Sequence, residues 1–434
     1  MRKLLVLLVA LIIVLSIVLR GSSATPVIDV TSPVTVIGQA TPVSIHIHNK
    51  HGIRDLTAFI EQNGTRYRVA QNAERSKLAD RIWSVTVGTS STPQLQDGKA
   101  VFIVEARSNG LMGKTAHWEQ AVTVVVHPPM VSVDSDQHYV YRGMADLATL
   151  NVSGNFTAAG VRVGDQTFRA WPMPDGKPGM FSLYAFAWNM PQSTVPVVFA
   201  SNGAGNDVTS PINVQFPKKE QPVYTVHDLK LDDRFIQKVV GELDPNGSGD
   251  MIARFVKINN EMRRANNKTL ADLRLKTADH FLWSQPFQRQ PHAKNEATFA
   301  DVRNYYYNGK KIDEQVHLGY DLAVTQNVGV EASNDGKVVY AAPLGIYGNC
   351  IVVDHGYGLQ TIYGHLSRID VHEGDMVKRG QVMGLSGMTG MAGGDHIHFT
   401  MQLDGVQIDP KEWWDPHWIK DHVARRVSLP GFGG

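Results

Sequence analysis

The stretch His317-Leu-Gly-Tyr-Asp321 and the later stretch His396-Ile-His398 each carry two residues of the kinds that bind metal ions. Imidazole nitrogens and carboxylate oxygens are the usual ligands of a borderline-soft ion such as zinc. Residues two or four apart on an extended strand point to one face, so both pairs can aim at a single point from adjacent strands. Gly319 lies between the first two candidates on that face and leaves space for an ion. The sequence therefore predicts a metal site on β-strands.

Three protein ligands and one water molecule make up a typical catalytic zinc site. The chain contains no His-Glu-x-x-His sequence, so a zinc site built on a single helix is excluded. We therefore expect one zinc ion on a β scaffold. His46 and His48 form another His-x-His pair, but no matching set of carboxylates accompanies them, and we do not expect that pair to bind metal.

The size and charge of the chain set broad limits on its organisation and partners. A chain of 434 residues is too long for one ordinary hydrophobic core, and about two to four domains are expected. The charge is nearly balanced, with 42 basic and 41 acidic residues, and there is no basic tract of the kind that binds nucleic acid. We therefore expect no nucleic acid partner.

Residues 1–24 have the pattern of a membrane anchor. Arg2 and Lys3 precede an apolar run from Leu4 to Leu19, and Arg20 follows it. As a helix the run would span about 24 Å, slightly less than a bilayer core, but it is longer than the apolar region of most signal peptides. We expect an uncleaved, single-pass anchor in the inner (cytoplasmic) membrane with the bulk of the chain in the periplasm. Cleavage at the end of this segment is the alternative.

Residues 25–129 and 130–217 are predicted to form two β-rich modules. In both, short β-forming segments alternate with Gly, Asn and Pro, which is typical of a sandwich of two antiparallel sheets. We expect two immunoglobulin-like β-sandwiches that serve in spacing or in binding. The sequence leaves open which of these roles they have and whether an envelope protein is their partner.

The spacing of apolar residues changes after a linker at 217–222. Apolar residues then recur with the period of an amphipathic helix, in two runs. These runs are Phe235, Ile236, Val239, Val240 and Leu243, and then Met251, Ile252, Phe255, Ile258 and Met262. With a turn at 244–249 between them, they predict a helical hairpin within a linker region at 223–282.

Residues 283–415 return to strands and hold both metal-ligand stretches. Tight turns separate the clearest predicted strands, which are 337–341, 349–354, 359–365, 381–385 and 396–403. We expect a compact antiparallel β domain here, followed by a tail at 416–434. His355 and His372 lie at turns of this domain and are expected to be exposed.

A series of short motifs runs through this domain in a fixed order. They are Phe299-Ala-Asp-Val-Arg303, His317-Leu-Gly-Tyr-Asp321, Asp354-His-Gly-Tyr-Gly358, Thr361-Ile-Tyr-Gly-His365, Gly387-Met-Thr-Gly390 and Gly394-Asp-His396-Ile-His398. Together they resemble the lysostaphin-type, or LytM-like, zinc endopeptidases of bacteria, which cut peptidoglycan. The resemblance covers residues 287–414, and Ala300 stands where that family more often has glycine.

The resemblance implies roles for five residues. His317, Asp321 and His398 would hold one zinc ion, and His365 and His396 would be the catalytic histidines, with their division of labour left open. Zinc lowers the pKa of its bound water toward about 7, and an imidazole beside that water can take a proton or stabilise an oxyanion. The expected activity is hydrolysis of peptide bonds in peptidoglycan stem peptides or cross-links during cell-wall remodelling.

The fold class that follows is mainly β and multidomain. It comprises an N-terminal membrane helix, two immunoglobulin-like β-sandwiches, a helical hairpin and a C-terminal antiparallel β peptidase domain. The alternative function is a non-catalytic wall-binding regulator, or an activator of another cell-wall hydrolase. Inactive relatives would lack one or more of the five residues, and all five are present here, so an active peptidase is favoured. The hairpin at 232–267 is the nearest candidate for a lid over the active site.

Overall fold

The computed structural model describes residues 24–30, 34–205, 207–217 and 224–432. The predicted anchor thus lies outside the described residues, except for Ala24. Within the described ranges, no helix has both the length and the apolar character needed to cross a bilayer. The described chain is mainly β with few helices, as the sequence predicts. It forms two compact units, the first running to Met130 and the second holding most of the remainder.

Two sheets make up the module before residue 130. Its strands are β1 (Val27–Val30), β2 (Val36–Ile37), β3 (Thr41–His48), β4 (Ile53–Gln62), β5 (Thr65–Asn72), β6 (Asp80–Val87), β7 (Gly98–Ser108) and β8 (Thr115–Val124). They form a three-stranded sheet, β1-β3-β6, and a five-stranded sheet, β2-β8-β7-β4-β5. Ile45, Leu56 and Phe102 belong to one core that residues of both sheets share. Two sheets packed on a common core fit the predicted sandwich, while its immunoglobulin-like character stays a prediction.

Shorter strands make up the stretch from residue 130 to residue 217. They are β9 (Met130–Val133), β10 (His138–Tyr139), β11 (Ala145–Ser153), β12 (Ala158–Val163), β13 (Gln166–Arg169), β14 (Trp171–Pro172), β15 (Met180–Ala185), β16 (Val197–Ser201), β17 (Val208–Pro211) and β18 (Val214–Gln215). They form two four-stranded sheets, β14-β15-β11-β9 and β13-β12-β16-β17, and a parallel pair of β10 with β18. Here too the immunoglobulin-like character is not tested.

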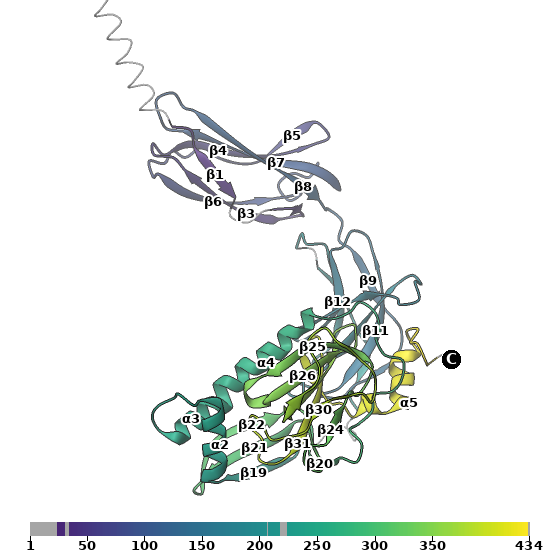
Figure 1. Ribbon diagram of the computed structural model, residues 1–434. Coiled ribbons are helices and arrows are strands. Elements are labelled where there is room, and N and C mark those ends of the chain that lie inside the picture. The colour runs from purple at the N-terminus through teal and green to yellow at the C-terminus, as the bar shows by residue number, and fades with distance from the viewer. Residues whose placement is uncertain (1–23, 31–33, 206, 218–223, 433–434) are drawn as a thin grey trace, which may run out of the picture. The chain divides into compact units, whose positions relative to one another are not determined.

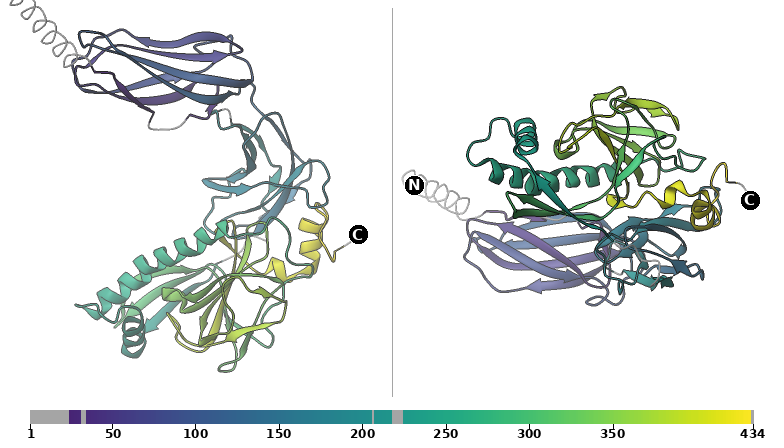
Figure 2. Two further views of the ribbon diagram at one scale, coloured as in Figure 1. Left: turned by 45° about the horizontal axis from the view of Figure 1, so that its top comes forward. Right: turned by 90° about the horizontal axis from the view of Figure 1, so that it is seen from below.

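The predicted helical hairpin is present and is longer than expected. It follows β19 (Val226–Leu231) and comprises α2 (Asp233–Leu243), α3 (Met251–Lys257), the π-turn η1 (Ile258–Met262), α4 (Arg263–Asp272) and the 3₁₀ turn η2 (Leu273–Leu275). Asp232 and Asp250 cap the two helical runs, because each side chain accepts a hydrogen bond from a free backbone N–H of the first turn. The second run continues beyond residue 267, where the predicted hairpin ends, to Asp272, as the long helix of Figures 1 and 2 shows.

Three sheets build the C-terminal part of the chain. The strands and short helices are β20 (Lys294–Ala297), β21 (Asp301–Tyr307), β22 (Lys310–His317), β23 (Tyr320–Ala323), β24 (Gly329–Glu331), β25 (Gly336–Pro343), η3 (Gly345–Tyr347), β26 (Asn349–Asp354), β27 (Leu359–Leu366), β28 (Arg368–Ile369), β29 (Met376–Val377), β30 (Val382–Leu385), β31 (His396–Leu403), β32 (Val406–Ile408), η4 (Glu412–Trp414), α5 (Pro416–Ile419) and η5 (Lys420–Ala424). All five predicted strands are present. The main sheet has eight strands, β20-β23-β31-β27-β26-β25-β29 with β32 beside β31. Two three-stranded sheets, β19-β21-β22 and β24-β30-β28, accompany it.

The predicted C-terminal tail begins with a helix and makes buried polar contacts. His422 and Arg426 lie 3.0 and 3.2 Å from one oxygen of Asp146, a residue of β11 that is fully buried. The other oxygen of Asp146 lies 2.6 Å from Nδ1 of His138, whose Nε2 is 3.0 Å from Asp134. A buried carboxylate needs such partners, because an unpaired charge in the interior is costly. The tail is therefore fixed to β11 and, through Asp146, to His138 of β10.

This network predicts a pH-dependent stability. Burial alone would lower the pKa of His138, but the hydrogen bonds that it donates to Asp134 and Asp146 raise it to about 9. A histidine whose folded pKa exceeds its ordinary value of about 6.5 stabilises the protein fully below that value and loses this contribution as the pH rises toward the folded pKa. We expect the free energy of unfolding to fall between pH 6.5 and 9, by roughly 3 kcal/mol at most.

Denaturant unfolding of the full chain across this pH range would measure the effect. His138→Gln should flatten the slope, whereas the same change at His372, whose side chain is 91% exposed, should not. Equal slopes in wild type and His138→Gln would contradict the prediction.

Candidate metal centre

The structure brings together the three residues predicted to hold zinc. His317 is the last residue of β22, and Asp321 lies in β23, where it is paired in register with His398 of β31. The expectation that His317 and Asp321 share one strand is wrong, because the chain passes from the three-stranded sheet to the eight-stranded sheet between them. The two side chains converge across that change of sheet and not along one strand.

Gly319 occupies this change of sheet and makes room for a ligand ring. A Cβ built at Gly319 would lie 2.5 Å from Cε1 and 2.7 Å from Nε2 of His398. Cβ atoms in proteins essentially never approach other atoms this closely. Glycine is therefore needed at position 319 so that the His398 ring can pack against the backbone, and not only to leave space for an ion. This refines the prediction that the position leaves room for metal.

The donor atoms form a small triangle. His317 Nε2 is 2.9 Å from His398 Nδ1 and 3.0 Å from Asp321 Oδ1, and the last two atoms are 3.4 Å apart. Ligand atoms around a tetrahedral zinc at about 2.0–2.2 Å are separated by roughly 3.3 Å. No other group of His, Cys, Asp or Glu in the described ranges is as well placed for a metal ion. Two imidazoles and one carboxylate are also the donor set that suits zinc.

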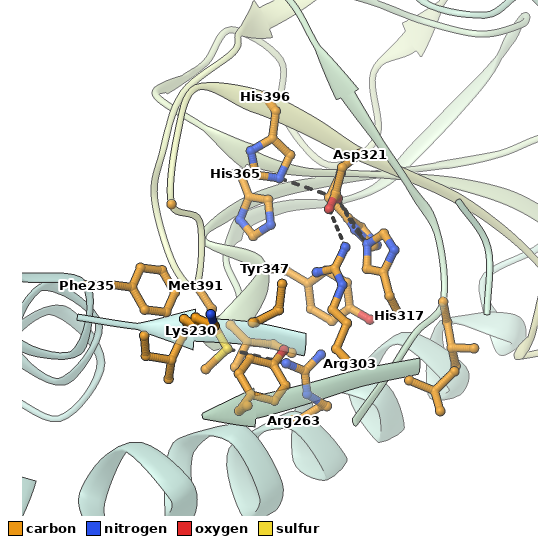
Figure 3. A pocket seen from close by; sticks show the side chains of 18 of the residues that line it. Lys230, Phe235, Arg263, Arg303, His317, Asp321, Tyr347, His365, Met391 and His396 are labelled. Carbon is orange, nitrogen blue, oxygen red and sulfur yellow. Dashed lines mark hydrogen bonds and ion pairs between the residues drawn. The ribbon is translucent and has the colours of Figure 1, made fainter. Parts of the chain in front are cut away.

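A guanidinium group completes the surroundings of the carboxylate. Arg303 of β21 donates to Asp321 Oδ2 at 2.6 Å, and its side chain is only 20% exposed. Figure 3 shows Arg303 reaching Asp321 beside His317. Arg303 is thus paired with a candidate metal ligand and also lines the cavity of the site. It engages the carboxylate oxygen that the triangle of donor atoms does not use, so it can orient the ligand from behind.

Both predicted catalytic histidines lie beside the triangle. His396 precedes His398 by two residues on β31, and its Nε2 is 3.4 Å from Asp321 Oδ1. The ring centroids of His365 and His396 are 4.8 Å apart, as Figure 3 illustrates. Each Nδ1 bonds a backbone carbonyl, of Thr389 for His365 and of Gly394 for His396, at 2.8 Å in both cases. If Nδ1 donates in these bonds, Nε2 is the atom that each ring offers to the site.

An unusual backbone angle turns His365 toward the site. Its neighbour Gly364 pairs with His398, so strand alternation would point His365 away. The φ angle of His365 is +67°, in the left-handed region, which interrupts the alternation. A non-glycine residue pays roughly 1–3 kcal/mol for such an angle, and these residues gather at functional sites. Ala300 also has a positive φ, +63°, which accounts for the glycine that the family more often has there.

Burial and charge separate the histidines electrostatically. Burial lowers the pKa of His317. It lowers the pKa of His365 well below the usual range and the pKa of His398 to about 4. His396 differs: burial opposes its charged form, but the hydrogen bond and charge of Asp321 raise its pKa. Burial would also raise the pKa of Asp321, yet His317 and the other two nearby histidines hold it well below normal. Imidazoles that stay neutral are competent metal ligands and proton acceptors.

A cavity of about 470 Å³ opens at this site. Its lining includes four of the histidines, Asp321 and Arg303. It also includes residues for which the sequence predicted no individual role, namely Asp228, Lys230, Phe235, Arg263, Asn267, Tyr347 and Met391, of which Phe235, Arg263 and Asn267 belong to the hairpin predicted to lie near the site. Figure 3 shows Phe235 and Met391 on the side away from Asp321. Most of these residues come from β19 and the helical segment. No spacing within either segment points to a site that lies so far along the chain.

Two other histidine predictions need correction. His355 was expected to be exposed but is fully buried, with Nδ1 2.7 Å from the Asp335 carbonyl and Nε2 2.8 Å from Thr361 Oγ1. His46 and His48 do have a nearby carboxylate, because Asp80 on the neighbouring strand lies 3.3 and 2.9 Å from them. These three residues nevertheless do not form a group close enough to share an ion.

Comparison with known proteins identifies the domain. The model of peptidase family M23 matches residues 315–410. Peptidoglycan DD-endopeptidase ShyA of Vibrio cholerae is 42% identical over 114 residues, which are 26% of this chain and 25% of that protein. Murein hydrolase activator EnvC of Escherichia coli is 32% identical over 95 residues, 22% and 23% of the two chains. The match therefore spans about a quarter of the length of these relatives.

A solved structure is also similar. The catalytic domain of lysostaphin from Staphylococcus simulans is 29% identical and covers 28% of this chain and 92% of that chain, with a TM-score of 0.24. Residues 315–410 are thus a peptidase family M23 domain, the lysostaphin type that the motifs indicated. Members of this family are zinc metallopeptidases, and the His317, Asp321 and His398 cluster is the group that fits their metal.

The contact of Arg303 with Asp321 predicts an effect on metal affinity. Arg303→Met removes the hydrogen bond that orients the carboxylate, and losing such an outer partner typically weakens metal binding about 10- to 100-fold. Competition with a chromophoric zinc chelator would measure the dissociation constant of the full chain. Arg264→Met, at an exposed position of α4, should bind zinc like wild type. Tighter binding in Arg303→Met would show that the guanidinium repels the ion more than it orients the ligand.

Gly319 gives a second test of the metal site. The methyl group of Gly319→Ala would collide with the His398 ring. The ring would then move, and its Nδ1 would be displaced from the donor atoms of His317 and Asp321. We expect the variant to stay folded but to retain less zinc than wild type after dialysis, as measured by elemental analysis. Gly241→Ala is the matched control, because a Cβ there meets no atom within 4 Å. Full zinc content in Gly319→Ala would contradict the assigned cluster.

Proposed function

We propose that this chain is a zinc-dependent endopeptidase that hydrolyses peptide bonds in peptidoglycan stem peptides or cross-links. The observation that carries the proposal is the convergence of five side chains on one cavity. Three of them, His317, Asp321 and His398, have donor atoms 2.9–3.4 Å apart. The other two, His365 and His396, present their rings at the edge of this cluster.

The proposed chemistry divides between the ion and the two histidines. When bound by the cluster, zinc would supply a Lewis acid that polarises a peptide carbonyl and makes water acidic. His365 would accept a proton at Nε2, because burial keeps its ring neutral and the Thr389 carbonyl occupies Nδ1. His396 would hold a proton at Nε2, favoured by Asp321, and deliver it to the leaving amine. This assignment is our proposal for the division of labour that the sequence left open.

The cavity supports a peptide substrate. Its lining mixes apolar side chains, such as Phe235 and Met391, with the cations Lys230 and Arg263. The carboxylates of Asp228 and Asp232 also line the cavity, so groups of both charges and apolar surface are available to a peptide. The similarity to a relative described as a peptidoglycan DD-endopeptidase favours the same substrate class.

A non-catalytic role is the second candidate. The relative EnvC is described as a murein hydrolase activator, and it matches this chain over a similar stretch. A domain of this family can therefore serve as a regulator. The presence of all five residues in this chain favours catalysis over regulation.

We further propose that the protein acts from the inner membrane. The apolar run at residues 4–19 would anchor it, with the remaining chain in the periplasm facing the wall. The two β-rich modules would then serve as spacers or would bind an envelope protein. A membrane fraction that releases the protein only with detergent would support the anchor, and recovery in a salt wash would contradict it.

The activity itself is tested on defined muropeptides. Purified full chain with one equivalent of zinc should release new amino groups, and mass spectrometry of the fragments should identify the cleaved bond. His365→Ala should lower turnover by on the order of 10²–10⁴-fold and keep its zinc, because it removes a proton acceptor and no ligand. His317→Ala should lose both activity and zinc.

His372→Ala is the control, since this histidine is exposed on the same domain. If zinc-loaded wild type cleaves no muropeptide but accelerates another wall hydrolase, the chain is an activator. Equal activity in His365→Ala and wild type would remove His365 from the proposed mechanism.

A further inference from the structure

The helical segment shares its hydrophobic core with the strands that carry the candidate site. Val239 and Val240 of α2 and Leu270 of α4 are buried in one cluster with Tyr305 of β21 and Val352 of β26. Figures 1 and 2 show these helices against the same strands. Segments that open and close easily have few buried apolar contacts, and α2 does not meet that condition. The core therefore fixes α2 beside the site.

Two polar side chains of α2 form hydrogen bonds with residues 388–392, which we call the 388–392 loop. Lys238 and Glu242 lie one helical turn apart and are paired at 3.2 Å, with side chains 31% and 36% exposed. The Lys238 ammonium donates to three backbone carbonyls, those of Met388 at 2.6 Å, Gly390, and Ala392 at 3.3 Å. Glu242 accepts from the Gly390 N–H. The ion pair of Lys238 and Glu242 thus provides partners for three backbone carbonyls and one N–H of the same loop.

The same loop orients His365. The Thr389 carbonyl takes the hydrogen bond from His365 Nδ1 at 2.8 Å. The Thr389 hydroxyl is also fixed, because it donates to the Leu366 carbonyl at 2.8 Å and accepts from the Asn349 N–H at 2.9 Å. A displacement of the loop would therefore move the carbonyl that sets the direction of the His365 ring.

The backbone of His365 makes this support necessary. Its φ of +67° is unfavourable for a side chain of this size, and such an angle persists only where the surroundings over-determine it. The 388–392 loop contacts this ring through Thr389. From outside the main sheet, α2 bonds Met388, Gly390 and Ala392 of the loop. Met391 is held separately, because its N–H donates to the Ile346 carbonyl of η3 at 2.9 Å and its sulfur lies 3.3 Å from Arg263 of α4.

We propose that Lys238 and Glu242 are positioning residues, which fix the 388–392 loop so that Thr389 holds His365 in its working orientation. The catalytic consequence rests on the proposed function. We name the contacts of Lys238 and Glu242 with the 388–392 loop the clamp. The clamp does not depend on the proposed function, because it rests only on the hydrogen bonds described above. In this arrangement α2 forms a wall of the cavity through Phe235, and the lid role of the hairpin stays a prediction that the test below addresses.

The test compares variants of the full zinc-loaded chain on a defined muropeptide. Lys238→Met keeps the length and apolar stem of the side chain but loses all three hydrogen bonds. We expect kcat to fall by about 10- to 100-fold, the range that small misplacements of catalytic groups produce, with KM little changed and zinc content intact. Glu242→Ala should act in the same direction, and Glu242→Gln, which retains an acceptor for Gly390, should recover most of the activity.

A second readout does not depend on turnover. Amide hydrogen exchange in the 388–392 loop, Gly390 above all, should accelerate in Lys238→Met, and the ¹⁵N signal of His365 Nδ1 should shift. Lys257→Met, at an exposed position of α3, should change neither. If wild type cleaves nothing, the proposed function fails, and these exchange data still decide whether the clamp exists.

Two outcomes would overturn the proposal. Unchanged exchange and an unchanged His365 signal in Lys238→Met would show that the loop is held without α2. A rise in kcat/KM in Lys238→Met would show that the helix obstructs substrate and acts as a lid.

Discussion

The pairing of β23 with β31 places Asp321 directly opposite His398, and the site is arranged around that buried carboxylate. Asp321 is 9% exposed and lies within 3.4 Å of three histidine nitrogens and 2.6 Å of Arg303. A carboxylate buried this deeply requires compensating positive charge. Arg303 supplies one such charge permanently. The negative charge of Asp321 can also attract a metal cation or a protonated histidine. The same carboxylate therefore favours both metal binding and proton transfer.

Local patterns in the sequence predict the helical runs, the metal-ligand cluster and the strands of the C-terminal domain. Hydrophobic spacing placed the helical runs that begin near Phe235 and Met251, because an amphipathic helix records its buried face in its own sequence. The ligand residue types indicated the metal cluster without knowledge of the fold. The predicted strand at 396–403 has the bounds of β31, since His, His, Thr and Gln alternate there with Ile, Phe, Met and Leu, which is the period of a strand.

The remaining features depend on contacts that leave no trace in local sequence. The carbonyls of Thr389 and Gly394 orient the two catalytic candidates, yet any residue type has a carbonyl. His355 lies at a turn, as predicted, but its burial depends on Thr361 and on packing from outside the turn. Lys238 reads as an ordinary surface residue of a helix, because the loop that it binds is far along the chain.

The buried carboxylate of Asp146 has an evolutionary consequence. Multidomain proteins are expected to diversify by exchange of whole modules, which succeeds where few contacts cross the junction. In this chain a recombination event at the start of the M23 domain would separate Asp146 from His422 and Arg426, stranding ions of both signs. Residues 131–151, which hold Asp146, lie in one compact unit with the C-terminal helix and should be exchanged together with it, so breakpoints are expected ahead of β9.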